Sequence, residues 1–330
     1  MKAVVLRSYS SPGNLQVTDI GVPVPADDEV LVRVRATSVN PYDWHHISGT
    51  PRVARLMAGT VGLRAPKIGV AGCDMAGQVE GVGEGVREFR PGDDVFALLR
   101  EGGFAEYVSV RQDLLARMPA NLSYEQAAAV PMAAATALLA VRDSGQIEPG
   151  QHVLVNGASG GVGTFAVQLA AAFGALVTGV CSAKNADLVR SLGAKEVIDY
   201  QTEDFTRRGR DYDLIIDMAG SRPARACVRA LTPKGTLVIV GGPAGRWLQP
   251  VGHVLGGVAL APFVRQRVTV ADITRHRDQK GLLTTLTELI ETGKVTPVID
   301  RRYPFTEISE AVSYQEEGHS AGKVAVTVAG

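Results

Sequence analysis

Four glycines stand within residues 157–163, which read Gly-Ala-Ser-Gly-Gly-Val-Gly. An apolar β-branched run, 153–155, comes before them, and residues 164–170 have the apolar spacing of a helix. In such a strand–turn–helix the glycines let the backbone turn sharply and let a phosphate approach main-chain N–H groups. The helix start adds unpaired amides and a positive dipole end. We therefore expect a dinucleotide pyrophosphate to be lined by Ser159, Gly160, Gly161 and Val162.

The next expected strand, 175–181, indicates which dinucleotide binds. In NAD-selective sites an Asp or Glu about 20 residues beyond the glycines binds the ribose 2′-hydroxyl. Here the strand is followed by Ser182-Ala183-Lys184, which carries no carboxylate to repel a 2′-phosphate. Lys184 supplies a positive charge and Ser182 a hydroxyl donor. The sequence therefore predicts NADPH as the cofactor; the alternative for Lys184 is a solvated lysine at a helix start.

The composition is that of an ordinary globular protein. Among 330 residues, 34 Lys and Arg balance 34 Asp and Glu, so there is no electrostatic case for a nucleic-acid partner. Cys73, Cys181 and Cys227 are widely spaced, which argues for a reducing compartment and against a disulfide framework. The longest apolar stretch, 251–264, is shorter than the roughly 20 residues of a membrane helix. We expect a cytoplasmic protein with no membrane partner.

Hydrophobic periodicity separates two regions of the chain. Residues 29–36 alternate in polarity, as in a half-buried antiparallel strand, and 77–83 and 94–98 continue this pattern. Ser123 and Gln126 have the spacing of a helix capping box, and a second helix is expected near 133–145.

Beyond residue 150, strands alternate with helical segments. This series is typical of a doubly wound parallel sheet, and so of the α/β class. The expected strands are 152–156, 175–181, 195–199, 213–217, 235–240 and 267–271. Helices near 280–292 and 306–317 and a strand at 323–328 are expected to return to the first domain.

Six motifs occur in a fixed order along the chain. They are Val-Asn-Pro-Tyr-Asp at 39–43, Gly-Cys-Asp-Met-Ala-Gly at 72–77, Arg-Pro-Gly-Asp-Asp-Val at 90–95, Gly-Phe-Ala-Glu-Tyr-Val at 103–108, Ala-Thr-Ala at 135–137 and the glycine motif at 158–163. With them the chain resembles the medium-chain dehydrogenase/reductase superfamily nearly end to end. The resemblance is to its zinc-free quinone oxidoreductase branch and the related reticulon-interacting-protein-like and enoyl reductases.

This resemblance implies a two-domain architecture. A GroES-like catalytic domain that contains a β-barrel would comprise residues 1–121 and 273–330. A Rossmann domain that binds NADPH would comprise 122–272, with the active site in the cleft. Zinc-dependent members have a Cys where this chain has Asn40 and a His where it has Cys73, and a third Cys ligand is missing near 131–133.

A catalytic zinc needs three protein ligands, so we expect no metal. The adjacent His45 and His46 do not rebuild the set, because neighbouring side chains point in different directions. Without a Lewis acid, alcohol oxidation loses its electrophile, whereas reduction of a quinone or an α,β-unsaturated carbonyl needs a positioned nicotinamide and polar donors.

The resemblance also implies roles for single residues. Asn40 would contact the nicotinamide carboxamide or the substrate carbonyl, and Thr136 the nicotinamide ribose or ring; a turn residue and a buried helical Thr are the alternatives. Tyr200 would present its hydroxyl to the adenosine phosphate, or lie on the surface at a strand end. The remaining cofactor contacts would be Ala219 beneath the adenosine, Gly241 and Gly242 beside the nicotinamide, and Lys323 near the C-terminus.

The sequence does not identify the group that donates the proton in the reduction. Our hypothesis is that Tyr42 or His45 orients the acceptor carbonyl, while a solvent proton is the alternative. Residues 52–67 are expected to form either a substrate lid or a segment packed on the barrel. The segment 247–263 is expected to be a substrate wall, a dimer contact or core.

Strand 267–271 would leave a free edge at the end of the sheet, which predicts a homodimer. Two other functions remain possible from the sequence. One is alcohol dehydrogenase-type carbonyl chemistry, which needs a metal or a tyrosine–lysine pair. The other is a non-catalytic NADPH-binding sensor or partner protein.

Overall fold

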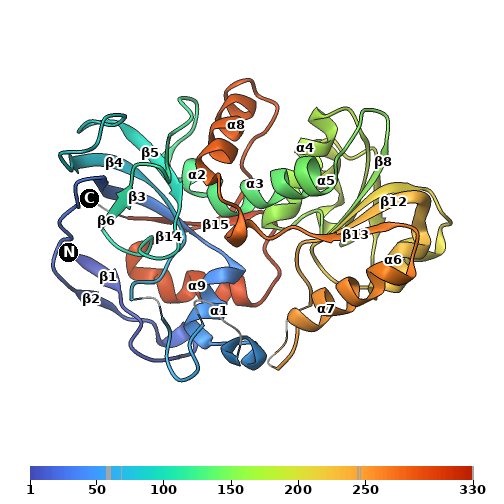
Figure 1. Cartoon of the computed structure of the whole chain (residues 1–330), viewed down its shortest axis with the longest axis horizontal. Helices are drawn as coiled ribbons and strands as arrows, with labels where there is room; N and C mark the ends of the chain where they lie inside the picture. Colours follow the sequence, from blue (N-terminus) through green and yellow to red (C-terminus); the bar gives the residue numbers. More distant parts are fainter. Residues whose placement is uncertain (57–60, 68, 244, 246, 329–330) are drawn as a thin grey trace. The chain divides into compact units, whose positions relative to one another are not determined.

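The computed structural model describes residues 1–56, 61–67, 69–243, 245 and 247–328 (Figure 1). The chain forms two compact units. Unit 1 comprises Met1–Ala133, Arg277–Gly293 and Pro297–Gly330, and unit 2 comprises Ala134–His276 and Lys294–Thr296. Among the helices of the described part of the chain, none has the length and apolar character needed to cross a bilayer.

Unit 2 is built on a six-stranded parallel sheet in the order β10-β9-β8-β11-β12-β13. Its strands are β8 His152–Asn156, β9 Leu176–Cys181, β10 Glu196–Asp199, β11 Tyr212–Asp217, β12 Leu231–Ile239 and β13 Arg267–Val270. The chain leaves β8 in one direction along the sheet and returns on its other side at β11, which confirms the doubly wound fold. The carboxyl ends of β8 and β11 therefore flank the point where ligands bind in such sheets.

Helical segments connect these strands. Their bounds are α3 Pro131–Leu138, η3 Leu139–Ser144, α4 Gly161–Ala172, η4 Ala183–Asn185, α5 Ala186–Ser191, η5 Phe205–Arg207, α6 Ala224–Ala230, α7 Val251–Leu260, η6 Ala261–Phe263 and η7 Ile273–Arg275. α3 begins in unit 1 and continues into unit 2. α6 and α7 lie side by side (Figure 1).

Unit 1 is organised by one long strand, β3 Glu29–Val39. β3 pairs with β4 Asp74–Val82 on one side, and on the other with β6 Tyr107–Arg111 and then β15 Lys323–Thr327. The other strands of this seven-stranded sheet are β5 Asp94–Leu98, β7 Leu115–Arg117 and β14 Ile299–Pro304, and β1 Lys2–Val4 pairs separately with β2 Val17–Asp19. β15, from the far end of the chain, thus lies beside β3.

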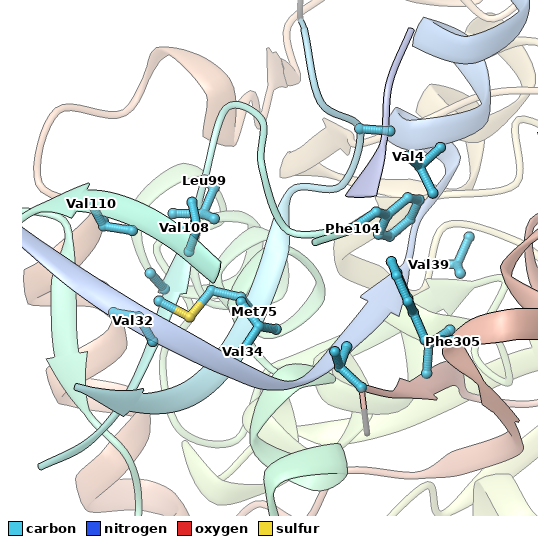
Figure 2. Close-up of a cluster of buried hydrophobic side chains, with 14 of the residues drawn as sticks. Val4, Val32, Val34, Val39, Met75, Leu99, Phe104, Val108, Val110 and Phe305 are labelled. Atoms are coloured by element: carbon cyan, nitrogen blue, oxygen red, sulfur yellow. The ribbon is translucent and has the colours of Figure 1, made fainter. Parts of the chain in front are cut away.

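The alternating pattern of β3 buries one of its faces, as expected. Val32 and Val34 pack in a cluster with Met75 and Val108, and Phe104 lies beside Val4 in the same cluster (Figure 2). This packing holds β3 against β4 and thereby fixes the residues at the end of β3 and the start of β4.

Short helices complete unit 1. They are η1 Pro12–Asn14, α1 Pro41–Ser48, η2 Arg52–Leu56, α2 Tyr124–Ala128, α8 Gln279–Glu291, η8 Phe305–Glu307 and α9 Ile308–Glu316. The predicted capping box is confirmed: Gln126 N donates to Ser123 Oγ at 3.3 Å, and Ser123 N donates to Gln126 Oε1 at 3.0 Å. Strand β14 was not anticipated, because its run of charged residues gives no apolar alternation.

Candidate active site

The glycine turn of unit 2 joins β8 to α4, with Gly160 as the N-cap. Gly163 is required by the fold, because a Cβ there would lie 2.0 Å from the Gly157 carbonyl oxygen. Gly160 is different: its φ is −78°, and an added Cβ would come no closer than 3.5 Å to another atom. The protein's own packing therefore does not explain the missing side chain at Gly160. The turn leaves backbone N–H groups at the start of α4 open to a phosphate, so these residues fit a dinucleotide.

The residues predicted to select NADPH over NADH follow the carboxyl ends of two neighbouring strands, β9 and β10. Tyr200 follows β10, and its N–H donates to the carbonyl of Cys181, the last residue of β9, at 3.2 Å. Ser182 and Lys184 come directly after Cys181, and Lys184 is exposed. Asn185 Nδ2 donates to Ser159 Oγ at 3.0 Å, which links this segment to the glycine turn. The structure therefore brings these residues together from two adjacent strands.

Three of the other predicted cofactor residues of unit 2 lie at the carboxyl ends of its parallel strands. A Cβ on Gly157 would lie 3.5 Å from Ala219 Cβ, so Ala219 faces the glycine turn. Gly241 and Gly242 follow β12, and so also lie at the carboxyl ends of the parallel strands. Thr136 lies in α3 and is 6% exposed. The first three positions fit the predicted contacts, whose roles stay predictions.

The sequence reasoning missed a buried polar network at the carboxyl ends of β8 and β11. Asp217, the last residue of β11, is fully buried. Its Oδ1 accepts hydrogen bonds from Asn156 Nδ2 at 2.7 Å and Gly220 N at 2.9 Å, and its Oδ2 lies 2.9 Å from His253 Nε2. Since a carboxylate accepts, Nε2 carries the proton. The sequence did contain a sign of this network: each of two apolar strands ends in a polar residue, Asn156 in β8 and Asp217 in β11.

Unit 1 contains a second buried network, centred on Asp74. Asp74 begins β4 and is fully buried. Its Oδ2 accepts from Ser38 Oγ at 2.7 Å and Asn40 Nδ2 at 2.8 Å, and lies 3.4 Å from Lys323 Nζ. Its Oδ1 accepts from the backbone N–H of Met132, at the start of α3, at 2.8 Å. The carboxylate thus ties together β3, β15 and α3.

Lys323 supplies the positive charge of this network. Its side chain is 3% exposed, and Nζ also donates to Val39 O at 3.2 Å and to Asn40 Oδ1. Three acceptors match the three N–H groups of an ammonium. The predicted contact between Lys323 and the cofactor stays a prediction; the structure shows its ammonium engaged within unit 1.

Asn40 is held by the same network. Its Nδ2 donates to Asp74 and lies 3.3 Å from Cys73 Sγ, while its Oδ1 accepts from Lys323. The side chain is 2% exposed. Both ends of the amide are therefore engaged within unit 1, so the geometry shows Asn40 as an oriented, buried amide at the start of α1.

Asp43 and Cys73 lie beside Asn40, and burial changes the acidity of both. Asp43 Oδ2 accepts from Asn40 N at 2.8 Å. Burial, and then the nearby charge of Asp74, raise the pKa of Asp43 to about 7. Burial likewise raises the pKa of the Cys73 thiol well above its ordinary value, so Cys73 is a neutral thiol at neutral pH.

The two candidates for orienting a carbonyl differ in protonation. His45 Nδ1 lies 2.6 Å from Thr50 O and must carry the proton, since a carbonyl only accepts. Burial lowers the pKa of His45 to about 4, so the ring is neutral at neutral pH and its Nε2 accepts but does not donate. Tyr42 Oη donates to Arg100 O at 3.3 Å and keeps a phenolic hydroxyl. Tyr42 is therefore the better candidate for a donor, although its one phenolic proton would have to leave Arg100 O to reach a substrate oxygen.

Only the start of the predicted lid segment, 52–67, can be followed continuously, because 57–60 lie outside the described residues. Arg55, in η2, donates from Nε to Gly49 O at 2.7 Å and stands over the Tyr9 ring. This part of the segment packs on unit 1, at the end of α1. A lid role stays a prediction.

No group of three or more His, Cys, Asp or Glu side chains suited to a metal ion occurs among the residues that the structure describes. The three cysteines, Cys73, Cys181 and Cys227, are free and buried.

Comparisons with known proteins agree with this arrangement. Residues 26–120 match a family model described as an alcohol dehydrogenase GroES-like domain, and residues 192–326 match one described as a zinc-binding dehydrogenase. The chain is 31% identical to the chloroplast envelope quinone oxidoreductase homolog of Arabidopsis thaliana, over 99% of this chain and 98% of that protein. It is 32% identical to the NADPH-dependent alkenal/one oxidoreductase of the same plant, over 99% of this chain and 79% of that protein.

A solved structure shows the same fold. The quinone oxidoreductase from Coxiella burnetii superposes with a TM-score of 0.83 at 27% identity, covering 100% of this chain and 99% of that one. The resemblance seen in the motifs is confirmed, and so are the expected α/β Rossmann-like and GroES-like domains. The chain belongs to the medium-chain dehydrogenase/reductase superfamily, in its quinone oxidoreductase branch of NAD(P)H-dependent oxidoreductases.

Proposed function

We propose that this protein uses NADPH to reduce a quinone or an α,β-unsaturated carbonyl. The observation that carries the proposal is the open position at Gly160, where the chain omits a side chain that its own packing would accept. It lies at the carboxyl ends of the parallel strands, where dinucleotides bind in such sheets. Relatives named quinone oxidoreductase and alkenal/one oxidoreductase support the acceptor class.

NADPH is proposed over NADH because of the residues after β9. Lys184 is exposed, and among the described residues no hydrogen bond or ion pair engages its ammonium. Ser182 precedes it, and Tyr200 lies beside Cys181. These three groups supply a cation and hydroxyl donors for a 2′-phosphate.

We also propose that the reaction needs no zinc. The positions corresponding to zinc ligands hold the Asn40 amide and the neutral Cys73 thiol, whereas zinc binds thiolate or imidazole. Lys323 places an ammonium on Asn40 itself, and a second cation there would be repelled. This donor set does not fit a zinc ion.

The bound nicotinamide would supply a hydride, and a proton completes the reduction. As negative charge develops on the acceptor oxygen, a positioned donor stabilises it. We propose the Tyr42 hydroxyl for this role and solvent as the source of the proton. Asn40 would act through its fixed position at the start of α1, oriented by Asp74 and Lys323.

The proposal is tested by mixing the protein with NADPH and a panel of quinones and enones while following nicotinamide absorbance. Turnover that persists after treatment with a zinc chelator is expected. Turnover with NADPH should exceed that with NADH, and Lys184→Ala should reduce the difference. Binding of NADPH without turnover of any acceptor would point to a sensor, and zinc-dependent alcohol oxidation to the dehydrogenase alternative.

Tyr42→Phe and His45→Ala test the two carbonyl-orienting candidates. An unchanged rate of turnover in either variant removes that residue from the mechanism.

We further propose a homodimer formed through β13. This strand ends the sheet and carries a free edge in the described chain. Exposed apolar side chains lie on the preceding helix, with Leu255 55% and Val258 53% exposed. A second copy would pair the strand edges and cover these side chains. Sedimentation or light scattering, with a charge introduced in β13, tests this; a wild-type monomer would contradict it.

The free cysteines support a cytoplasmic location. All three are buried and unpaired, as expected in a reducing compartment. Fluorescent tagging at the C-terminus, with fractionation, tests the assignment.

A further inference from the structure

The side chain of Asn185 does not do what its position in the helix favours. Asn185 is the N-cap of α5, where an Asn side chain normally accepts a hydrogen bond from the first turn of the helix. It makes no such bond here. Instead, its Nδ2 donates to Ser159 Oγ in the glycine turn at 3.0 Å, across 26 residues of the chain. A good capping residue is thus used for a contact with the glycine turn.

Backbone hydrogen bonds hold both partners of this contact in place. The N–H groups of Gly157 and Ala158 donate to Val180 O, in β9, at 3.1 and 3.0 Å. Asn185 N donates to Ser182 O at 3.0 Å, which closes the short turn after β9. The side-chain bond therefore joins two segments whose backbones are already fixed to the same strand. Its remaining effect is to set the direction of one hydroxyl.

The bond leaves the hydroxyl proton of Ser159 available. Because Asn185 Nδ2 is a donor, Ser159 Oγ acts as the acceptor and keeps its own proton for another partner. Within the part of the chain that the structure describes, the Ser159 side chain makes no further hydrogen bond. A phosphate oxygen is an acceptor of the kind that this hydroxyl lacks.

The pyrophosphate and the 2′-phosphate of NADPH could each accept this proton. The motif alone assigns Ser159 to the pyrophosphate, whose other donors are the N–H groups at the start of α4, beyond Gly160. The side chain of Ser159, however, is bonded to the residue that directly follows Lys184. Lys184 is exposed and supplies the cation proposed for the 2′-phosphate. The position of Ser159 Oγ therefore favours the 2′-phosphate.

We propose that Asn185 is a positioning residue for the 2′-phosphate of NADPH, and that it acts by directing the Ser159 hydroxyl to that phosphate. This inference rests on the proposed function and adds two residues to the basis of its preference for NADPH. Ser159 contacts the phosphate, and Asn185 acts only through Ser159. The pair changes the affinity for the cofactor and takes no part in hydride transfer.

The binding test uses two probes that differ only in the 2′-phosphate, 2′-phospho-ADP-ribose and ADP-ribose, titrated calorimetrically. Both contain the pyrophosphate and neither contains nicotinamide, so no turnover is needed. Ser159→Ala should weaken binding of the phosphorylated probe by about 3–10-fold, as for the loss of one hydrogen bond to a charged group, and change binding of ADP-ribose by less than about twofold. A hydroxyl that bound the pyrophosphate would weaken both probes equally.

Two variants of Asn185 test the positioning role. Asn185→Leu removes the donor and should weaken the phosphorylated probe by about 2–5-fold. Because the amide acts through the hydroxyl, the double variant Ser159→Ala/Asn185→Leu should bind as Ser159→Ala does.

Asn185→Asp keeps the size of the side chain and a preferred N-cap residue, so the fold should be retained, which urea denaturation checks. Its carboxylate would take the Ser159 proton and repel the phosphate. The phosphorylated probe should bind about tenfold or more weakly, and ADP-ribose nearly as before.

Ser191→Ala is the matched control. The Ser191 hydroxyl lies in the same helix, α5, and donates to Leu188 O at 2.7 Å. Its removal deletes a hydroxyl from this helix without changing any contact with the glycine turn. Both probes should bind this variant as they bind the wild type.

The outcomes separate this inference from the proposed function. Equal losses for the two probes in Ser159→Ala, or additive losses in the double variant, would overturn the inference while a wild-type preference for the phosphorylated probe left the proposed function intact. Equal binding of both probes by the wild type would overturn the proposed preference for NADPH, and the inference with it. If no quinone or enone is reduced, only the proposed reaction fails, because the two probes still report the 2′-phosphate site.

Discussion

Two fully buried aspartates, Asp74 in unit 1 and Asp217 in unit 2, hold the candidate site in different ways. Asp74 faces the ammonium of Lys323, and the network closes on itself through Asn40. Asp217 receives hydrogen bonds from an amide, a backbone N–H and His253. The first network fixes side chains around a buried charge pair, whereas the second fixes loops beside an open phosphate turn. The buried polar groups of unit 1 thus hold its own side chains in place, whereas those of unit 2 hold the loops beside the phosphate turn.

The largest effect expected from this difference is on stability. Lys323→Met leaves the Asp74 carboxylate buried without its cation, which should lower the free energy of unfolding by about 3–5 kcal/mol. Urea denaturation measures the loss. The double variant Lys323→Met/Asp74→Asn removes both charges and should recover more than half of it. A single variant as stable as the wild type would mean that the pair does not hold unit 1 together.

The charge balance of the Asp74 network also predicts a pH dependence. The pKa of Asp43 is raised from 3.8 to about 7. Between these values the native state holds a proton that the unfolded state has lost, so Asp43 lowers stability as pH rises through this window, by up to about 1.4 kcal/mol per pH unit. Above pH 7 its contribution is constant.

Asp43→Asn isolates this contribution. The stability difference between the variant and the wild type should shift in favour of the variant from pH 5 to pH 7 and then level off. Comparison of the two proteins cancels the paired carboxylates, such as Asp93, whose lowered pKa acts in the opposite direction. Parallel pH profiles for the two proteins would show that Asp43 is ionised in the native state at pH 5.

In unit 2 the corresponding change is expected to be smaller. His253→Leu removes one of three donors to the Asp217 carboxylate and leaves the Asn156 and Gly220 hydrogen bonds in place. A loss of about 1.5–3 kcal/mol is expected, as for a hydrogen bond to a charged group. If this loss matched that of Lys323→Met, the contrast between the two networks would disappear. Thermal denaturation of both variants under one condition makes the comparison.

The sequence predicted the fold well where periodicity carried the information. The six strands of unit 2 were located to within a few residues, because buried parallel strands are continuous apolar runs bounded by turns. β12 begins at Leu231, four residues earlier than expected, and its pairing with β11 shifts register near that end. β14 was missed because Asp300, Arg301 and Arg302 give no apolar alternation on this edge strand.

The site was only partly predictable for a related reason. The glycine turn and Ser182-Ala183-Lys184 are local in sequence, so their spacing identified them. The Asp74 network joins residues as far apart as Asn40 and Lys323, and no local pattern reports such a contact. Asp217 could be recognised as the last residue of a strand, but its buried hydrogen-bond network includes His253, 36 residues later. Hydrogen bonds between distant segments require the fold before they can be inferred.

The smallest expected change in stability separates the two roles of glycine in the phosphate turn. Gly160→Ala should leave the free energy of unfolding within about 0.5 kcal/mol, because nothing within 3.5 Å meets its Cβ. It should nevertheless weaken NADPH binding by about tenfold or more, since the methyl group occupies the space that a phosphate needs. Gly163→Ala is the matched control, because its Cβ would meet the Gly157 carbonyl oxygen at 2.0 Å and should destabilise the fold by about 1–3 kcal/mol. Fluorescence titration of NADPH alongside denaturation measures both quantities. Unchanged NADPH affinity in Gly160→Ala would show that the opening at the start of α4 is not the phosphate site, and the binding edge of unit 2 would then have to lie elsewhere.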